Sequence, residues 1–155
     1  MPKRAHLIAG LLALLCLVTF FLSTVLTELL GSHAAIAQLK AMIVAPGLWI
    51  MIPAMVAVGA SGMFLGKSRK GRLVGAKRKR MPFIAANGLL VLVPCAIVLN
   101  RWAAAGSFDT SFYVVQVIEL VAGAINLLLM GLNARDVLRL AGRLRAAQPS
   151  HGKAM

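Results

Sequence analysis

The chain has 155 residues, of which 60% are hydrophobic, and it carries a formal net charge of +13. A soluble domain of this size is normally about half apolar, so the composition places the chain in a lipid bilayer. The positive charge does not indicate nucleic-acid binding, because the Lys and Arg residues lie at the ends of apolar runs and not on one face of a soluble module.

The first apolar segment predicts a transmembrane helix over residues 6–30. Two basic residues precede it, as in a signal peptide, but the apolar run exceeds the 7–15 residues of a signal-peptide core. We therefore expect an uncleaved helix that starts in the cytoplasm. Thr19, Ser23 and Thr27 recur every fourth residue, and this face is predicted to point toward the other helices.

A second helix is predicted over residues 36–66. This span is longer than the roughly 20 residues that cross a bilayer, and Pro46 and Pro53 are the expected bend points. Residues 67–80 follow and hold eight of the seventeen Lys and Arg residues. So dense a group of positive charges between apolar segments predicts a cytoplasmic loop.

Two further helices are predicted over residues 82–100 and 111–133, with Pro82 in the first turn of the former. The last helix leads into a basic extension to about residue 146, either a cytoplasmic continuation of the helix or an amphipathic segment on the anionic leaflet. Residues 148–155 are expected to form a disordered tail. Aromatic residues between the two helices predict an interfacial belt. They are Trp102, Phe108, Phe112 and Tyr113.

Together these elements predict an all-α, integral membrane four-helix bundle over residues 1–147, with up-down-up-down topology. In this arrangement, fifteen of the seventeen Lys and Arg residues lie on the side of the two termini. By the positive-inside rule that side is the cytoplasm. We expect a multi-pass protein of a bacterial inner membrane whose basic side contacts anionic lipids.

The fourth predicted helix carries a stripe of polar and small residues at steps of three and four, which must face the interior of the bundle. The stripe consists of Gln116, Glu119, Gly123, Asn126, Met130 and Asn133. Asn87 in the third helix lies at the same depth as Asn126. We expect the two amides to form an interhelical hydrogen bond with a structural role.

Glu119 requires a partner or a proton at its depth in the membrane. Lys40 lies a turn into the second helix from the same side, and Glu28 and His33 gather at that end. We predict a small ligand-binding site that opens outward, formed by these four residues and Gln116. The alternative is a buried Lys40–Glu119 ion pair that only fixes how the helices pack.

In its number of helices, its orientation and its histidines near both surfaces, the chain resembles the four-helix membrane cytochromes b. The resemblance implies haem b with His6 and His33 as candidate axial ligands. Twenty-seven residues of helix place them about 40 Å apart, so each would need a different second ligand. Residues 81–100 and 112–136 also resemble uncharacterised small bacterial four-helix inner-membrane proteins, which implies no function.

The sequence contains no phosphate loop, zinc spacing, nucleophile elbow or pair of carboxylates, so neither catalysis nor a metal site is expected. The leading interpretation is a non-enzymatic inner-membrane protein. It would be an accessory subunit of a membrane partner or homo-oligomer, or a small-ligand binding protein. The second interpretation is a b-type haem electron carrier. The third is a small transporter that works as an oligomer, with Glu119 as its coupling carboxylate.

Overall fold

The computed structural model describes the backbone of residues 2–66 and 72–146, and the side chains of residues 6–60 and 80–136. Within these ranges every regular element is helical, and four stretches are long and apolar enough to span a membrane. They are His6–Leu30, His33–Ala60, Arg80–Ala104 and Thr110–Asp136. The predicted all-α class and the four apolar spans are confirmed, as expected of a multi-pass membrane protein.

The turn after the first span is short and well capped. Helix α1 (Pro2–Leu30) is followed by α2 (His33–Met42), which begins three residues before the predicted start. The Oγ atom of Ser32 accepts a hydrogen bond from the Ala35 N–H at 3.3 Å. This N-cap satisfies one of the free N–H groups of the first turn and so fixes where α2 starts.

The second span is bent at Pro46, one of the two predicted positions. A π-helical segment (Ile43–Leu48) joins α2 to α3 (Trp49–Gly66). Within it Ala45 is extended, with φ −140° and ψ 115°, before a cis peptide bond to Pro46. The proline ring disfavours the helical conformation of the residue that precedes it, so the helix breaks at this point.

The third predicted helix begins ten residues before its predicted start, because α4 runs from Arg72 to Asn87. Pro82 therefore lies inside a helix and not in a first turn, and the predicted loop is helical over residues 72–80. Residues 67–71 of that loop lie outside the described residues. Lys, Arg and Ala are good helix formers, so a basic segment can stay helical where it leaves the apolar region.

A second π-helical segment (Gly88–Leu92) joins α4 to α5 (Val93–Ala104). Pro94 occupies the first turn of α5. Proline has no N–H group and its ring collides with a regular helical turn, and the wider turn before it accommodates both effects.

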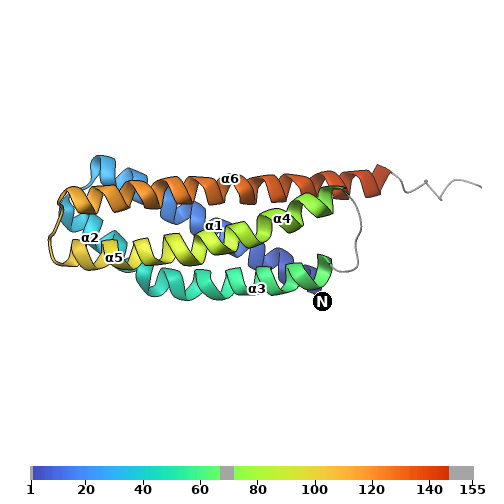
Figure 1. Ribbon diagram of the computed structural model, residues 1–155, viewed down its shortest axis with the longest axis horizontal. Coiled ribbons are helices and arrows are strands. Elements are labelled where there is room, and N and C mark those ends of the chain that lie inside the picture. Colours follow the sequence, from blue (N-terminus) through green and yellow to red (C-terminus); the bar gives the residue numbers. More distant parts are fainter. Residues whose placement is uncertain (1, 67–71, 147–155) are drawn as a thin grey trace, which may run out of the picture.

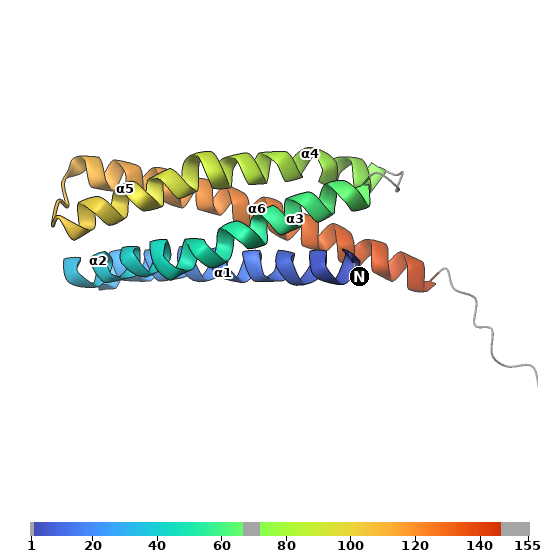
Figure 2. The same cartoon turned by 90° about the horizontal axis from the view of Figure 1, so that it is seen from below.

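Helix α6 (Thr110–Ala146) is continuous and extends past the rest of the bundle (Figures 1 and 2). Before it the chain turns at Gly106, which has a φ of 71°, and Oδ1 of Asp109 then accepts the Phe112 N–H at 3.0 Å. The basic extension is thus a continuation of the helix. The predicted tail over residues 148–155 lies outside the described residues.

The α1–α2 and α5–α6 turns lie at the same end of the bundle (Figure 1). We call this the turn end. A core cluster inside it combines α2, α5 and α6 through Ile36, Leu99, Ala103 and Phe112. Phe112 is fully buried, so the predicted interfacial belt is wrong for this residue. The helix rotation turns it inward, where it is part of this apolar cluster.

Candidate functional site

The polar stripe predicted for the last helix lies on the inner face of α6. Gln116, Asn126 and Asn133 are 3%, 1% and 9% exposed, and Asp136 continues the stripe at 5%. Residues between them, such as Val117 and Val121, are more than half exposed. Helix α6 therefore separates a lipid-facing apolar side from a buried polar side.

Lys40 of α2 and Glu119 of α6 form a buried ion pair. The Nζ atom of Lys40 lies 2.6 Å from Oε2 of Glu119, and Lys40 is only 1% exposed. Gln116 donates its Nε2–H to the same Oε2 atom at 3.1 Å. Two donors thus fix one oxygen of the carboxylate, while Oε1 accepts no hydrogen bond from the described residues. The contact predicted from equal depth is confirmed, and its role in binding a ligand stays a prediction.

Glu28 of α1 completes this group at the turn end. Lys40, Glu119 and His33 all act electrostatically on its carboxyl group, which places the four side chains in one neighbourhood. The Oε1 atoms of both Glu28 and Gln116 are buried and have no hydrogen-bond partner. The structure therefore brings together the five residues predicted to form the outer site. We call them the outer cluster.

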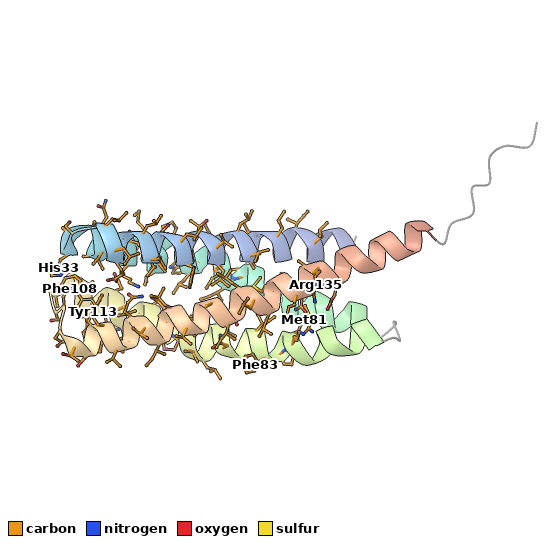
Figure 3. The ribbon with its side chains drawn as sticks, turned by 90° about the horizontal axis from the view of Figure 1, so that it is seen from above. His33, Met81, Phe83, Phe108, Tyr113 and Arg135 are labelled. Carbon is orange, nitrogen blue, oxygen red and sulfur yellow. The ribbon has the colours of Figure 1, made fainter. Side chains whose placement is uncertain are left out.

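His33 lies at the exposed edge of the outer cluster. Its ring is stacked on Phe108, with centroids 4.1 Å apart and planes 8° from parallel. Phe108 in turn packs edge-on against Phe112 at 4.9 Å. Figure 3 shows His33, Phe108 and Tyr113 gathered at the turn end, far from Arg135. These rings link the start of α2 to the α5–α6 turn.

A cavity of about 40 Å³ reaches the carboxylate of Glu119 from the interior of the bundle. Its polar lining comes from Thr24 and Glu119. The apolar lining residues are Leu17, Phe20, Phe21, Ile43, Leu48, Met51, Leu92, Ala96, Leu120 and Gly123. One water needs roughly 10–15 Å³ of such volume, so the cavity has room for about three waters.

Thr24 is a site residue that the sequence reasoning missed. The predicted inward face of α1 contained Thr19, which is exposed, whereas Thr24 is 3% exposed. The face is therefore rotated from the one predicted. One signal was present in the sequence: Thr24 lies four residues before Glu28, so the two share a face of the helix.

Asn87 of α4 and Asn126 of α6 meet as predicted from their depth. Asn87 donates Nδ2–H to Oδ1 of Asn126 and to the carbonyl oxygen of Ala122, each at 2.9 Å. Asn126 donates to the carbonyl oxygen of Ile84 at 3.4 Å. Next to this contact Gly88 lets Met55 of α3 pack closely, because a Cβ atom there would lie 2.5 Å from Cε of Met55. The amides bridge α4 and α6.

A second ion pair at the other end of the bundle was not predicted. The Nη1 atom of Arg80 lies 3.0 Å from Oδ2 of Asp136, whose side chain is 7% exposed. The sequence reasoning placed Arg80 in a loop and overlooked Asp136. The available signal was that Asp136 is the one acidic residue in the basic extension.

The two candidate haem ligands do not meet within the chain, and haem binding stays a prediction. His6 and His33 lie at opposite ends of α1 and its turn, about 40 Å apart. The face of His33 is covered by Phe108, and the cavity of about 40 Å³ is far smaller than a porphyrin. Within the described ranges, no group of three or more His, Cys, Asp or Glu residues could hold a metal ion. His151 lies outside these ranges.

Comparison of the chain with protein-family models, with curated proteins and with solved structures finds no match. What the protein can bind is therefore inferred from its own side chains.

Proposed function

We propose that the chain is a non-enzymatic inner-membrane protein that binds a small ligand at the outer cluster, alone or as an accessory subunit. Its four spans run up-down-up-down, with both termini in the cytoplasm of a bacterial cell. The support for this orientation is that, of the thirteen Lys and Arg residues whose backbone the structure describes, all but Lys40 and Arg101 lie toward the end of the bundle opposite the turn end. The turn end and its polar cluster then face outward.

The observation that carries the proposal is the incomplete pairing of the outer cluster beside a cavity. Buried polar atoms are normally hydrogen-bonded, and they are expensive to leave unpaired within a membrane. A polar cluster that served only to fix helix packing would be expected to pair all of its buried oxygen atoms with hydrogen-bond donors. Here one oxygen each of Glu28 and Gln116 is buried without a partner, and Glu119 presents its carboxylate to the cavity.

The path from the outer surface to the cavity follows one face of α1. Glu28 is half-buried close to the α1–α2 turn, and Thr24 lies one turn further in, where it lines the cavity. The two residues lie four apart, so their side chains share one face of α1. A ligand would therefore meet Glu28 first, then Thr24 and Glu119.

Cysteine labelling tests whether this path opens outward. In a variant without Cys16 and Cys95, Glu28→Cys and Thr24→Cys would each be exposed in intact cells to a small, membrane-impermeant thiosulfonate. We expect both to react, Thr24→Cys more slowly because it lies deeper. Only a thiolate reacts, and a thiol surrounded by lipid stays protonated.

Leu26→Cys is the matched control, because this residue lies on the same helix between the two sites and is 56% exposed to the lipid side. It should not react. The proposal is wrong if Thr24→Cys reacts no faster than Leu26→Cys, or if it reacts only after the inner face of the membrane is made accessible.

A further inference from the structure

We infer that the ligand is a small neutral molecule that binds inside the cavity beside Glu119, with a mainly apolar body of about two or three non-hydrogen atoms and one hydrogen-bond donor. The inference rests on the proposed function and names the class of ligand for that site. Three features of the cavity support it: its mainly apolar lining, the neutralised charge of the carboxylate in its wall, and its volume.

The wall of the cavity is apolar over most of its extent. Ten of the twelve described residues that line it are apolar, and they come from all four membrane spans. An ion would have to give up its hydration shell against hydrocarbon, and a hard cation needs several oxygen ligands in exchange. Among these lining residues only Thr24 and Glu119 supply side-chain oxygens. A ligand with an apolar body, by contrast, gains from contact with the rest of the wall.

The carboxylate in the wall does not require a further counter-charge. Nζ of Lys40 lies 2.6 Å from Oε2 of Glu119, and Lys40 is 1% exposed, so its positive charge is held against the carboxylate. A cation would compete with an ammonium group that is already in place. Lys40 does not line the cavity, so an anion would meet the carboxylate and not the ammonium group. A neutral ligand meets neither obstacle.

Both polar groups of the wall can accept a hydrogen bond. Oε2 of Glu119 accepts hydrogen bonds from Lys40 and Gln116, while Oε1 accepts none from the described residues. The hydroxyl group of Thr24 has acceptor lone pairs as well as its own donor. The ligand is therefore expected to bring a donor, such as the hydroxyl group of a short alcohol.

The volume of the cavity limits the size of the ligand and its affinity. A cavity of about 150 Å³ in a well-studied protein binds benzene, whereas this cavity measures about 40 Å³. By that comparison it holds a molecule no larger than methanol or ethanol. The free energy of binding that each atom of a small ligand can contribute is limited. The dissociation constant of such a molecule is therefore about a millimolar or weaker.

Nuclear magnetic resonance of methionine methyl groups tests the inference. The full chain, purified in detergent and isotope-labelled at these methyl groups, would be titrated with methanol, ethanol, tert-butanol or dimethyl ether. Met51 lines the cavity and is 3% exposed, whereas Met42 is 51% exposed. We expect methanol or ethanol to shift the Met51 resonance saturably, with half-saturation at about a millimolar or above. The Met42 resonance should shift without saturating, since alcohol dissolves in the detergent around it.

The other two compounds define what the cavity requires of its ligand. The bulkier tert-butanol carries the same hydroxyl group on a larger body and should give no saturable shift of Met51. Dimethyl ether has the same atoms as ethanol but no hydrogen-bond donor. It should bind more weakly than ethanol by about tenfold or more, because a hydrogen bond to a charged group is lost.

Three variants locate the effect. Ala96→Val adds methyl groups to the wall of the cavity and should abolish the saturable shift. Thr24→Val keeps the shape of the side chain but removes its hydroxyl group, and should weaken ethanol binding severalfold. Ala103→Val is the matched control. Ala103 lies on the same helix, α5, and is 3% exposed like Ala96, but it does not line the cavity, so the shift should remain.

The inference is wrong if neither alcohol shifts Met51 saturably, or if dimethyl ether and tert-butanol bind as well as ethanol. It is equally wrong if the saturable shift survives unchanged in both Ala96→Val and Thr24→Val, or if Ala103→Val abolishes it as Ala96→Val does. Labelling of Thr24→Cys from outside without alcohol binding would overturn the class of ligand alone and leave the outward site standing. Failure of that labelling would overturn the proposed function itself.

Discussion

The outer cluster and the Asn87–Asn126 contact both involve the buried face of α6, but their polar groups are paired to different extents. Asn126 lies about two turns further along α6 than Glu119. Asn87 of α4 donates to Oδ1 of Asn126 and to the carbonyl oxygen of Ala122, and Asn126 donates to the carbonyl oxygen of Ile84. Neither leaves a buried atom unpaired among the described residues. The outer cluster leaves two, beside a cavity. Complete pairing suffices to join helices, and the incomplete pairing beside a cavity is the basis of the proposed ligand site.

The two regions also differ in charge. The amide contact is neutral, whereas Lys40 and Glu119 bring opposite charges into the bundle interior, where the loss of either partner leaves the other exposed to a weakly polar environment. Substitutions in the outer cluster should therefore have larger effects than the same kind of substitution in the amide contact. The following predictions test this ranking.

The largest effect is expected for Glu119→Gln. It leaves Lys40, which is 1% exposed, without its counter-charge, and breaking such a pair costs about 3–5 kcal/mol. The double variant with Lys40→Met should recover most of the loss, because it removes both charges. Thermal unfolding in detergent measures both.

Asp109→Asn serves as the control at the same end and should unfold close to the unchanged protein. If Glu119→Gln also has the unfolding temperature of the unchanged protein, the ion pair does not stabilise the bundle. Glu119 would then be present for its ligand alone.

A smaller effect is expected for Asn126→Leu. It removes the acceptor of one Asn87 hydrogen bond, but Asn87 keeps its bond to the carbonyl oxygen of Ala122. We expect a loss of about 1–2 kcal/mol from the unpaired groups, including the carbonyl oxygen of Ile84. A double-mutant cycle with Asn87→Leu should give a coupling of about 0.6–1.7 kcal/mol.

This variant also separates the two regions, because it should leave the labelling of Thr24→Cys from outside intact. Loss of that labelling in Asn126→Leu would show that the two regions are one cooperative unit.

The smallest effect is expected for Arg80→Ala, at the far end from the outer cluster. The arginine side chain is 29% exposed and water can replace part of its contact with Asp136, so the loss should be about 1 kcal/mol or less. Added salt should reduce the difference between Arg80→Ala and the unchanged protein, since a partly exposed pair is screened. If salt does not change the stability difference between Arg80→Ala and the unchanged protein, the Arg80–Asp136 pair is as shielded from solvent as Lys40–Glu119.

The sequence predicted the Lys40–Glu119 and Asn87–Asn126 contacts correctly, and for the same reason. Depth in a membrane helix is a linear quantity, because each residue advances the chain by about 1.5 Å. Counting from the ends of the apolar runs therefore placed Lys40 level with Glu119, and Asn87 level with Asn126. The Arg80–Asp136 pair was missed because α4 starts within the basic stretch, where hydropathy gives no helix boundary.

By itself, then, the sequence determined the four apolar spans, their order and the depth of each charged or amide group along its helix. The tertiary structure decided how each helix is rotated: Thr24 faces the cavity and Thr19 does not, and Phe112 is buried. Lipid is as apolar as the interior of the bundle, so hydropathy cannot distinguish the inner face of a helix from its outer face. Only the packing of neighbouring helices fixes that rotation, and with it the cavity beside Glu119.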